Sequence, residues 1–425
     1  MLAVWRSRAL LVVLGASLLA SNSEAAIREL WRVYSTNTSE ARNFAVSASA
    51  MDTNGNIVLV GTYSTSPNKN LFIAAYDPTG LKLWEFTGRP TFRVFVDGLV
   101  IRPDGAVVVS FAESTGQSPT SASLLCVKDG ERQWERVEPN VAHDEGYRKL
   151  KVNENGEVFR LGFDYLEQPP ALNFPASVAK FDIAGHELWL TRPPFISIGT
   201  AYSPMPFDLS AAGHPVIAGV GHDGFPNIVA CLNEVTGKVR WKRRPRGVFS
   251  NNAAVKAGPK SICVSGDDGY VVYSNSGRRL AVRRDHRFFS DRITTTREGG
   301  FMLLSPYGGD YKAVLSPTGR LRWNSFSNPF SSFGFFEDAV EGYVFVSGTG
   351  STLVFRRGNR LGQPVSSEMF EGYPGASWNQ RGTIALAAPD GTWRVVVNRT
   401  GFDYFTIAAY GEAPDAAVSE RASSR

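Results

Sequence analysis

The sequence is poor in the residues that build disulfide, zinc and redox sites. Its 425 residues include three cysteines and five histidines, all at scattered positions. Isolated cysteines cannot form the dense disulfide framework of a small secreted protein, and they lack the paired spacing of most zinc folds. After residue 26 the chain also has no His-Glu-x-x-His, no Cys-x-x-Cys and no nucleophile elbow. We therefore expect no metal and no cofactor.

Long apolar stretches are nearly absent, and the one exception lies at the start of the chain. Arg6 and Arg8 precede an apolar run over residues 9–20, and Ser23-Glu24-Ala25 follows it with small residues at the two positions that a signal peptidase inspects. The run is shorter than the roughly 20 residues that a membrane-spanning helix needs. Residues 1–25 therefore predict a signal peptide, a secreted or periplasmic location, and no integral membrane protein.

A repeated phrase organises the rest of the chain. Each copy is an apolar strand, a turn ending in Gly, and a second strand with Trp four residues after that Gly. The clear copies end at Trp84, Trp134, Trp189, Trp241 and Trp323. Weaker copies run from Gly277 to Ala281, from Gly358 to Gly362 and from Gly401 to Phe405. The eight turn glycines follow one another at intervals of 39 to 55 residues.

Two further strand signals precede each phrase. In the first copy, residues 44–51 lead into Asn54-Gly55, a tight-hairpin signal, and then into Ile57-Val-Leu-Val. The second strand of the last unit is expected at Thr383-Ile-Ala-Leu-Ala. A period of 40–50 residues with four strands is typical of β-propeller blades. We expect one all-β propeller of four-stranded blades over residues 26–410, with eight blades favoured over seven, and a disordered tail over 411–425.

The ends of the chain offer two ways to close this ring. Residues 27–34 resemble a fourth strand without its own blade, because Trp31 occupies the outer-strand position. They are expected to pair with the C-terminal blade, although residues 402–410 could fill the same place. The repeated Trp residues are interpreted as blade-packing aromatics.

The phrase Ile228-Val-Ala-Cys-Leu-Asn-Glu-Val-Thr-Gly-Lys-Val-Arg-Trp241-Lys242 resembles the repeat of PQQ-like β-propellers. Quinoprotein dehydrogenases and outer-membrane-assembly lipoproteins of the BamB type share these blades, and the Asp-Pro-Thr-Gly copy also resembles the bacterial SBBP-type blade. The resemblance implies a bacterial propeller and carries no activity. Quinoprotein dehydrogenases are expected to have adjacent cysteines and a calcium site, whereas Cys126, Cys231 and Cys263 stand alone in apolar strands and are interpreted as buried, inert thiols. The lipidated cysteine of a BamB-type protein is also missing.

Two further motifs are interpreted as hairpin loops. Residues 219–224 match the dinucleotide fingerprint Gly-x-Gly-x-x-Gly, but an apolar strand follows where a phosphate-binding helix would begin. The segments around Asn54 and Asn155 resemble calcium loops but lack the later bidentate Glu.

Loop length and charge indicate where a ligand would bind. The first-second and third-fourth connections are short, whereas residues 163–176, 191–207 and 326–336 predict long loops on the opposite face, which is where function usually lies. Residues 238–297 contain 15 Lys or Arg and four Asp, although the whole chain carries only +5. The predicted ligand-binding residues are Arg243, Arg244, Arg246, Arg283, Arg284, Arg287, Phe288 and Phe289, because guanidinium groups beside aromatic rings suit anionic groups on a polymer. The alternative interpretation is a charged outer surface that only solubilises the protein.

These observations predict an exported, non-catalytic binding or scaffold protein that uses its long-loop face. Its expected partner is an anionic polymer, an envelope component or a protein, and not a nucleic acid, because the chain has no nucleic-acid motif. We expect a monomer. The alternative is a propeller enzyme that acts on a polysaccharide, with Asp144, Glu145, Asp164 and Asp208 as candidate acids by loop position.

Overall fold

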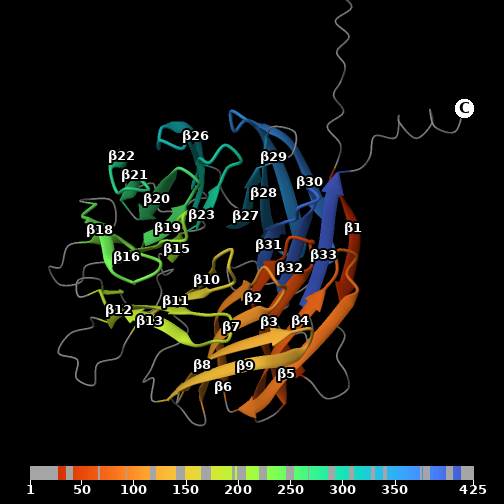
Figure 1. Cartoon of the computed structure of the whole chain (residues 1–425). Helices are drawn as coiled ribbons and strands as arrows, with labels where there is room; N and C mark the ends of the chain where they lie inside the picture. Colours follow the sequence, from red (N-terminus) through yellow and green to blue (C-terminus); the bar gives the residue numbers. More distant parts are fainter. Residues whose placement is uncertain are drawn as a thin grey trace, which may run out of the picture.

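Strands account for all the regular secondary structure that the structure describes. This computed structural model describes residues 27–34, 42–65, 68–91, 93–114, 121–139, 149–163, 174–193, 197–198, 207–219, 227–245, 253–266, 268–285, 292–305, 311–326, 331–337, 342–373, 376, 383–398 and 405–412. Its 33 strands form eight antiparallel sheets (Figure 1). Within these residues, no helix could span a membrane. The predicted signal peptide lies outside them.

Each sheet is one blade. Blade 1 comprises β2 (Arg42–Met51), β3 (Ile57–Thr65), β4 (Asn68–Tyr76) and β5 (Lys82–Thr91). Blade 2 comprises β6 (Arg93–Ile101), β7 (Val107–Ser114), β8 (Ser121–Lys128) and β9 (Glu131–Pro139). Blade 3 comprises β10 (Lys149–Val152), β11 (Val158–Phe163), β12 (Phe174–Phe181) and β13 (Glu187–Thr191), with the short β14 (Ser197–Ile198) paired to β12. Blade 4 comprises β15 (Phe207–Leu209), β16 (Pro215–Gly219), β17 (Ile228–Leu232) and β18 (Val239–Arg243).

The second half of the ring repeats this order. Blade 5 comprises β19 (Ala253–Ala257), β20 (Ser261–Gly266), β21 (Gly269–Ser274) and β22 (Arg279–Arg284). Blade 6 comprises β23 (Arg292–Thr295), β24 (Phe301–Ser305), β25 (Tyr311–Leu315) and β26 (Leu321–Phe326). Blade 7 comprises β27 (Ser331–Glu337), β28 (Gly342–Thr349), β29 (Thr352–Asn359) and β30 (Pro364–Phe370). Blade 8 comprises β31 (Thr383–Ala387), β32 (Trp393–Asn398), β33 (Phe405–Glu412) and β1 (Ile27–Tyr34).

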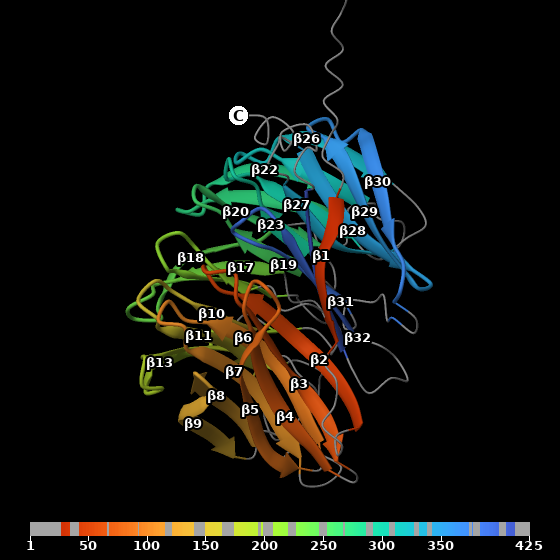
Figure 2. The ribbon, with the colours of Figure 1, turned by 90° about the vertical axis from the view of Figure 1, so that its right-hand side faces the viewer.

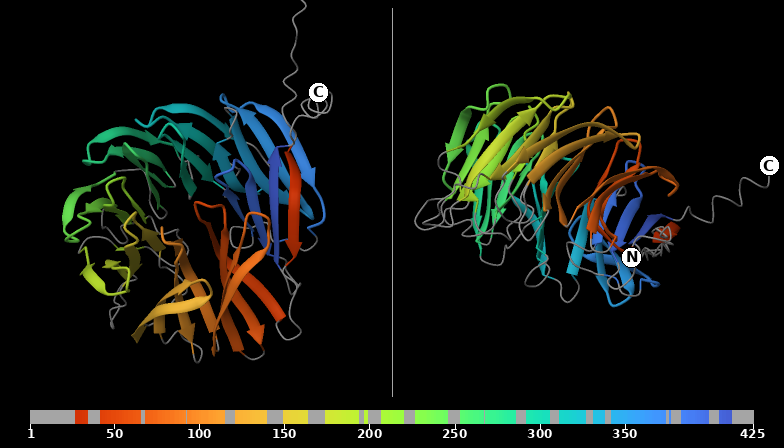
Figure 3. Two further views of the ribbon diagram at one scale, coloured as in Figure 1. Left: turned by 45° about the vertical axis from the view of Figure 1, so that its right-hand side comes forward. Right: turned by 90° about the horizontal axis from the view of Figure 1, so that it is seen from below.

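The blades surround a common axis, which confirms the eight-bladed propeller. The first strands of neighbouring blades contact one another, as β2 does β6 and β15 does β19, so these strands are innermost (Figure 3, left). The repeated Trp residues all lie on fourth strands, at the outer end of each sheet. Because one sheet cannot cover both of its own faces, each blade depends on its two neighbours for burial.

The N-terminal strand closes the ring. β1 pairs antiparallel with β33, with Arg32 opposite Ala408, and so becomes the fourth strand of blade 8 (Figure 1). Figure 2 shows β1, in red, with β31 and β32 of the same blade near it. The expectation that residues 27–34 pair with the C-terminal blade is confirmed. β33 is the third strand of the same blade and does not compete for that place. It continues to Glu412, two residues beyond the expected end of the propeller.

Two details of the predicted repeat are wrong. Gly358 lies inside β29, and the third-fourth turn of blade 7 is formed by Asn359–Gln363 with Gly362 at φ 74°. Residues 383–387 form the first strand of blade 8, not the second, because a Pro389-Asp390-Gly391 hairpin joins them to β32. Gly401 lies outside the described residues. Spacing alone could not distinguish the first-second hairpin of a blade from its third-fourth hairpin, since both place a glycine before a strand.

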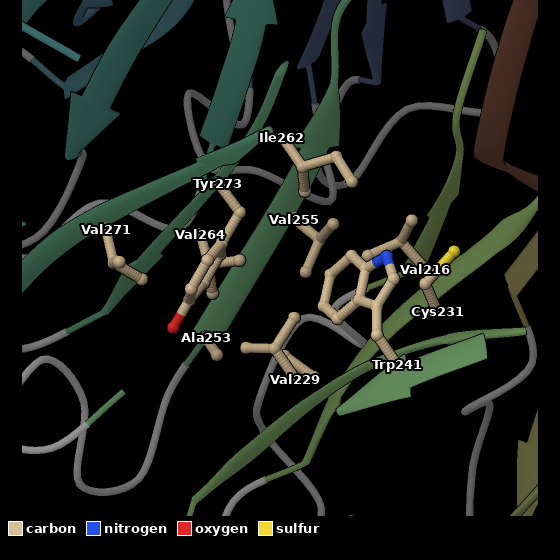
Figure 4. Packing of buried hydrophobic residues seen from close by; sticks show 11 residues of the cluster. Val216, Val229, Cys231, Trp241, Ala253, Val255, Ile262, Val264, Val271 and Tyr273 are labelled. Atoms are coloured by element: carbon tan, nitrogen blue, oxygen red, sulfur yellow. The ribbon is translucent and has the colours of Figure 1, made fainter. Parts of the chain in front are cut away.

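The core consists of separate layers between blades. Between blades 4 and 5, the indole of Trp241 lies among Val216, Val229, Cys231 and Val255 (Figure 4). Its nitrogen donates a 3.0 Å hydrogen bond to the carbonyl of Asn275, in the third-fourth turn of blade 5. Trp31, Trp134 and Trp189 donate in the same way to the turns of the following blades. Each of these Trp side chains therefore connects two neighbouring blades through a hydrogen bond.

Candidate functional site

Exposed basic side chains concentrate on the outer strands of blades 4 and 5. β18 and β22 together contain six Lys or Arg and no Asp or Glu. We call the following residues the basic rim: Lys238, Arg240, Lys242, Arg243, Arg244, Arg278, Arg279, Arg283 and Arg284. All are exposed except Arg283, which is half-buried. The strand alternation explains this exposure, because Trp241 points inward and its neighbours Arg240 and Lys242 point outward.

Arg243 is held against the next blade. Its Nε donates a 2.6 Å hydrogen bond to the carbonyl of Gly277, in the third-fourth turn of blade 5. A second nitrogen donates to the carbonyl of Lys242 at 2.8 Å, and the guanidinium lies 6.0 Å from the ring centre of Trp241. Arg243 therefore joins blades 4 and 5 in addition to contributing positive charge.

Arg283 and Arg284 end the outer strand of blade 5. Arg283 lies across from Tyr270 in the sheet, and its guanidinium is 3.9 Å from the Asp285 carboxylate. Arg284 is exposed and faces away from its half-buried neighbour. Arg246, Arg287, Phe288 and Phe289 lie outside the described residues, so these parts of the predicted site stay predictions.

Five members of the basic rim were not among the predicted ligand-binding residues. These are Lys238, Arg240, Lys242, Arg278 and Arg279, because the prediction considered only arginines near the ends of the strands. The signal for Arg240 and Lys242 was the alternation of charged and apolar residues along β18, which places them on the outer surface. Lys238 and Arg278 precede the outer strands, and Arg279 begins β22.

Asp208 lies on the innermost strand of blade 4 and connects this blade to blades 3 and 5. Its two carboxylate oxygens contact Lys151 Nζ of blade 3 at 2.8 Å and Lys256 Nζ of blade 5 at 3.0 Å. The backbone amide of Ala257 donates a further 2.9 Å hydrogen bond. Burial by itself raises the pKa of Asp208, but the two ammonium groups and the amide outweigh it and hold the pKa below its usual value. This carboxyl is thus a fixed anion and a poor proton donor.

Asp144, Glu145 and Asp164, the other candidate acids, lie outside the described residues, so their catalytic role stays a prediction. Within the described ranges, no three His, Cys, Asp or Glu side chains are close enough together to hold a metal ion. β16 ends at Gly219 and the next described element is strand β17, so no phosphate-binding helix opens at residue 228.

All three cysteines are buried and unpaired with one another, as the sequence predicted. Burial raises the pKa of the Cys231 thiol to about 11 and also raises the pKa values of Cys126 and Cys263. Because the thiolate is the reactive form, these side chains are inert in the folded protein.

Comparison with solved structures supports the fold. BamB from Moraxella catarrhalis is similar with a TM-score of 0.51 and 13% identity, covering 90% of this chain and 98% of that one. The C-terminal WD40 domain of Sif2 has a TM-score of 0.58 and 10% identity, covering 92% and 99%. Quinohemoprotein alcohol dehydrogenase from Comamonas testosteroni has a TM-score of 0.56 and 10% identity, covering 93% and 78%.

Sequence comparison does not assign the chain to a family. No protein-family model matches the chain, and a search of the curated proteins finds no match. A likeness at 10–13% identity shows architecture alone. The chain is therefore similar to bacterial and WD40-type propellers in its fold, and its function must be argued from its own surface.

Proposed function

We propose that this chain is an exported, non-catalytic β-propeller that binds an anionic polymer through the basic rim of blades 4 and 5. The observation that carries this proposal is the clustering of exposed basic side chains on two neighbouring outer strands that contain no acidic residue. Blade 2 offers a contrast, because Arg132 and Arg136 of its outer strand are paired with Glu135 and Glu187. The propeller fold of the neighbouring structures supports a binding or scaffold role in general.

The chemistry of the basic rim favours phosphate, sulfate or uronate groups. Guanidinium groups donate forked hydrogen bonds to such oxyanions, and Arg243 is already oriented by its contact with Gly277. Neighbouring blades repeat the same outer strand, so the charges follow one another around the rim. A polymer can therefore contact several of them at once, which raises its affinity above that of a single group.

Binding to heparin and to polyphosphate tests this proposal. Exchanging the exposed Arg240, Arg244, Arg279 and Arg284 for Gln should weaken binding about tenfold, since exposed charge contacts contribute roughly 0.2–1 kcal/mol each. Binding should also weaken as salt rises. The matched control replaces Lys69, Lys82, Arg320 and Arg360, which are exposed on other blades, with Gln. Equal losses in both variants, or no loss in either, would mean that the basic rim only solubilises the protein.

A further inference from the structure

The contact between blades 1 and 2 departs from the repeated pattern. At five of the six Trp positions, the indole ring lies against the turn glycine of the next blade, as Trp134 does against Gly185 and Trp241 against Gly277. Trp84 is the exception. The nearest atoms of blade 1 to the Gly130 side-chain position belong to the Glu85 backbone and the Trp84 Cβ. Among the described residues, the Trp84 indole nitrogen has no hydrogen-bond partner.

A shorter turn in blade 2 explains this difference. Lys128 pairs directly with Glu131, so only Asp129 and Gly130 form the third-fourth turn. Both have positive φ, 53° and 82°, as a two-residue type I′ hairpin requires. The corresponding turn of blade 3 spans Asp182–His186 and presents the Ile183 carbonyl to Trp134. Blade 2 has no comparable carbonyl for Trp84.

A groove of about 350 Å³ lies along the same contact. Its apolar surface comes from Leu71, Phe86, Phe111 and Leu125 of the two blades. Gly88 continues the row of Trp84 and Phe86 on β5, and a side chain added there would lie 3.1 Å from the Leu71 Cβ. The missing side chain at Gly88 therefore leaves room in the groove. This volume is within the usual range of small-ligand sites.

The charged groups of the groove differ in how firmly they are placed. The Glu113 side chain is 7% exposed and contacts Arg89 Nη2 at 2.5 Å, whereas the Arg89 side chain is 63% exposed. Glu135 is 20% exposed and pairs at 3.0 Å with Arg132, which is 61% exposed. Both carboxylates are thus built into the wall, and both guanidinium groups reach them from solvent. A long exposed side chain can leave at small cost, but a buried carboxylate needs a cationic partner.

We propose that this groove binds an arginine or lysine side chain of a protein partner, which takes the place of Arg89 on Glu113. The apolar surface of Phe86, Phe111 and Leu125 would cover the methylene stem of that side chain, and the carboxylates would bind its charged end. Arg89 already shows that a guanidinium fits there. This site goes beyond the proposed function, because it is far from the basic rim in the chain and takes the opposite charge.

Titration with N-acetyl-arginine methylamide, followed by calorimetry on the full mature protein, tests the site. The wild type should bind the probe saturably, with a Kd in the millimolar range that suits a single side chain. Arg89→Ala removes the internal competitor and should tighten binding about tenfold, the equivalent of one charge-assisted hydrogen bond. Glu113→Gln should abolish binding in both backgrounds. N-acetyl-norleucine methylamide, which lacks the charge, should not bind.

Matched controls keep the result specific. Arg136→Gln changes a residue of β9, the strand that contains Glu135. Arg136 pairs with Glu187 of blade 3, so this variant should leave binding of the probe unchanged. The variant with four basic-rim arginines exchanged for Gln should also bind the probe as the wild type does. Failure of the groove proposal can therefore be distinguished from failure of the basic-rim proposal. Circular dichroism shows whether the Glu113→Gln variant keeps its fold. If that variant does not fold, the tighter binding expected for Arg89→Ala still tests the site. Absence of saturable binding to the wild type, or equal binding with Gln at position 113, would overturn the proposal.

Discussion

The indole nitrogen of Trp31 donates a 2.8 Å hydrogen bond to the carbonyl oxygen of Pro78, and this contact joins blade 8 to blade 1. Arg394 reinforces it, because its guanidinium lies 5.5 Å from the Trp31 ring centre and donates to the same Pro78 carbonyl at 3.4 Å. On the inner side, the Asn398 amide exchanges two hydrogen bonds with the backbone of Val46. The ring is thus closed by side chains from both ends of the chain.

Removing the Trp31 side chain should therefore weaken the whole propeller. We expect Trp31→Ala to lower the free energy of unfolding by about 3 kcal/mol, because it removes a large aromatic contact and its hydrogen bond at the closing interface. Urea unfolding followed by circular dichroism measures this loss. Leu30→Ala is the matched control, since Leu30 is the adjacent residue of β1 and is 41% exposed; it should cost less than about 1 kcal/mol. Equal losses would show that Trp31 has no special part in closure.

The turn glycines should differ in their tolerance of alanine. Gly277 and Gly105 have almost the same positive φ, 81° and 80°, so alanine is strained by a similar roughly 1–2 kcal/mol at either position. At Gly277 a Cβ would also lie 2.7 Å from the Trp241 ring, whereas at Gly105 it would meet no atom within 4 Å. Thermal unfolding should therefore show a clearly larger drop in Tm for Gly277→Ala. Similar drops for both variants would argue that the glycines serve turn geometry alone.

The sequence predicted the features that repeat and missed those that depend on two different blades. The position of Trp31 predicted an outer strand at residues 27–34, because it matches the outer strand of every clear copy, but it did not exclude residues 402–410 from the same place. The predicted order of strands in blade 8 was wrong, because Gly401 fits the interval of the repeat, which predicts the third-fourth turn there. In the structure, Gly391 forms the first hairpin of this blade, between β31 and β32. The basic rim was visible as a run of charge, but the contact of Arg243 with Gly277 was not. The groove at Glu113 could not be predicted, because its walls come from two blades and part of its space comes from the missing side chain of Gly88 on β5.

The thiols should resist modification as long as the blades stay packed. Burial raises the pKa of Cys231 to about 11, and the other two cysteines are also buried within blades. We expect less than one thiol to react with Ellman's reagent in the native protein at pH 8 and three to react in denaturant, because thiolate and access are both needed. Cys263→Ser provides the reference for counting, with two thiols in denaturant. Rapid native labelling would mean that the blades open locally.

Asp208 should make the propeller sensitive to acid. Its pKa in the folded protein lies below the value near 3.9 of an unfolded aspartate, so its carboxylate stabilises the fold fully above about pH 4. This contribution is lost as the pH falls through the folded-state pKa and Lys151 and Lys256 lose their shared anion. At pH 7, Asp208→Asn should cost about 3 kcal/mol, since it leaves two partly buried ammonium groups without that partner.

The difference between wild type and Asp208→Asn should therefore shrink when unfolding is measured from pH 6 down to pH 2.5. Asp129→Asn is the control, because Asp129 is exposed in the turn of blade 2 and asparagine tolerates its positive φ. Its stability should follow that of the wild type across the same range. If the Asp208→Asn difference stays constant with pH, the carboxylate acts by shape and hydrogen bonding and not by its charge.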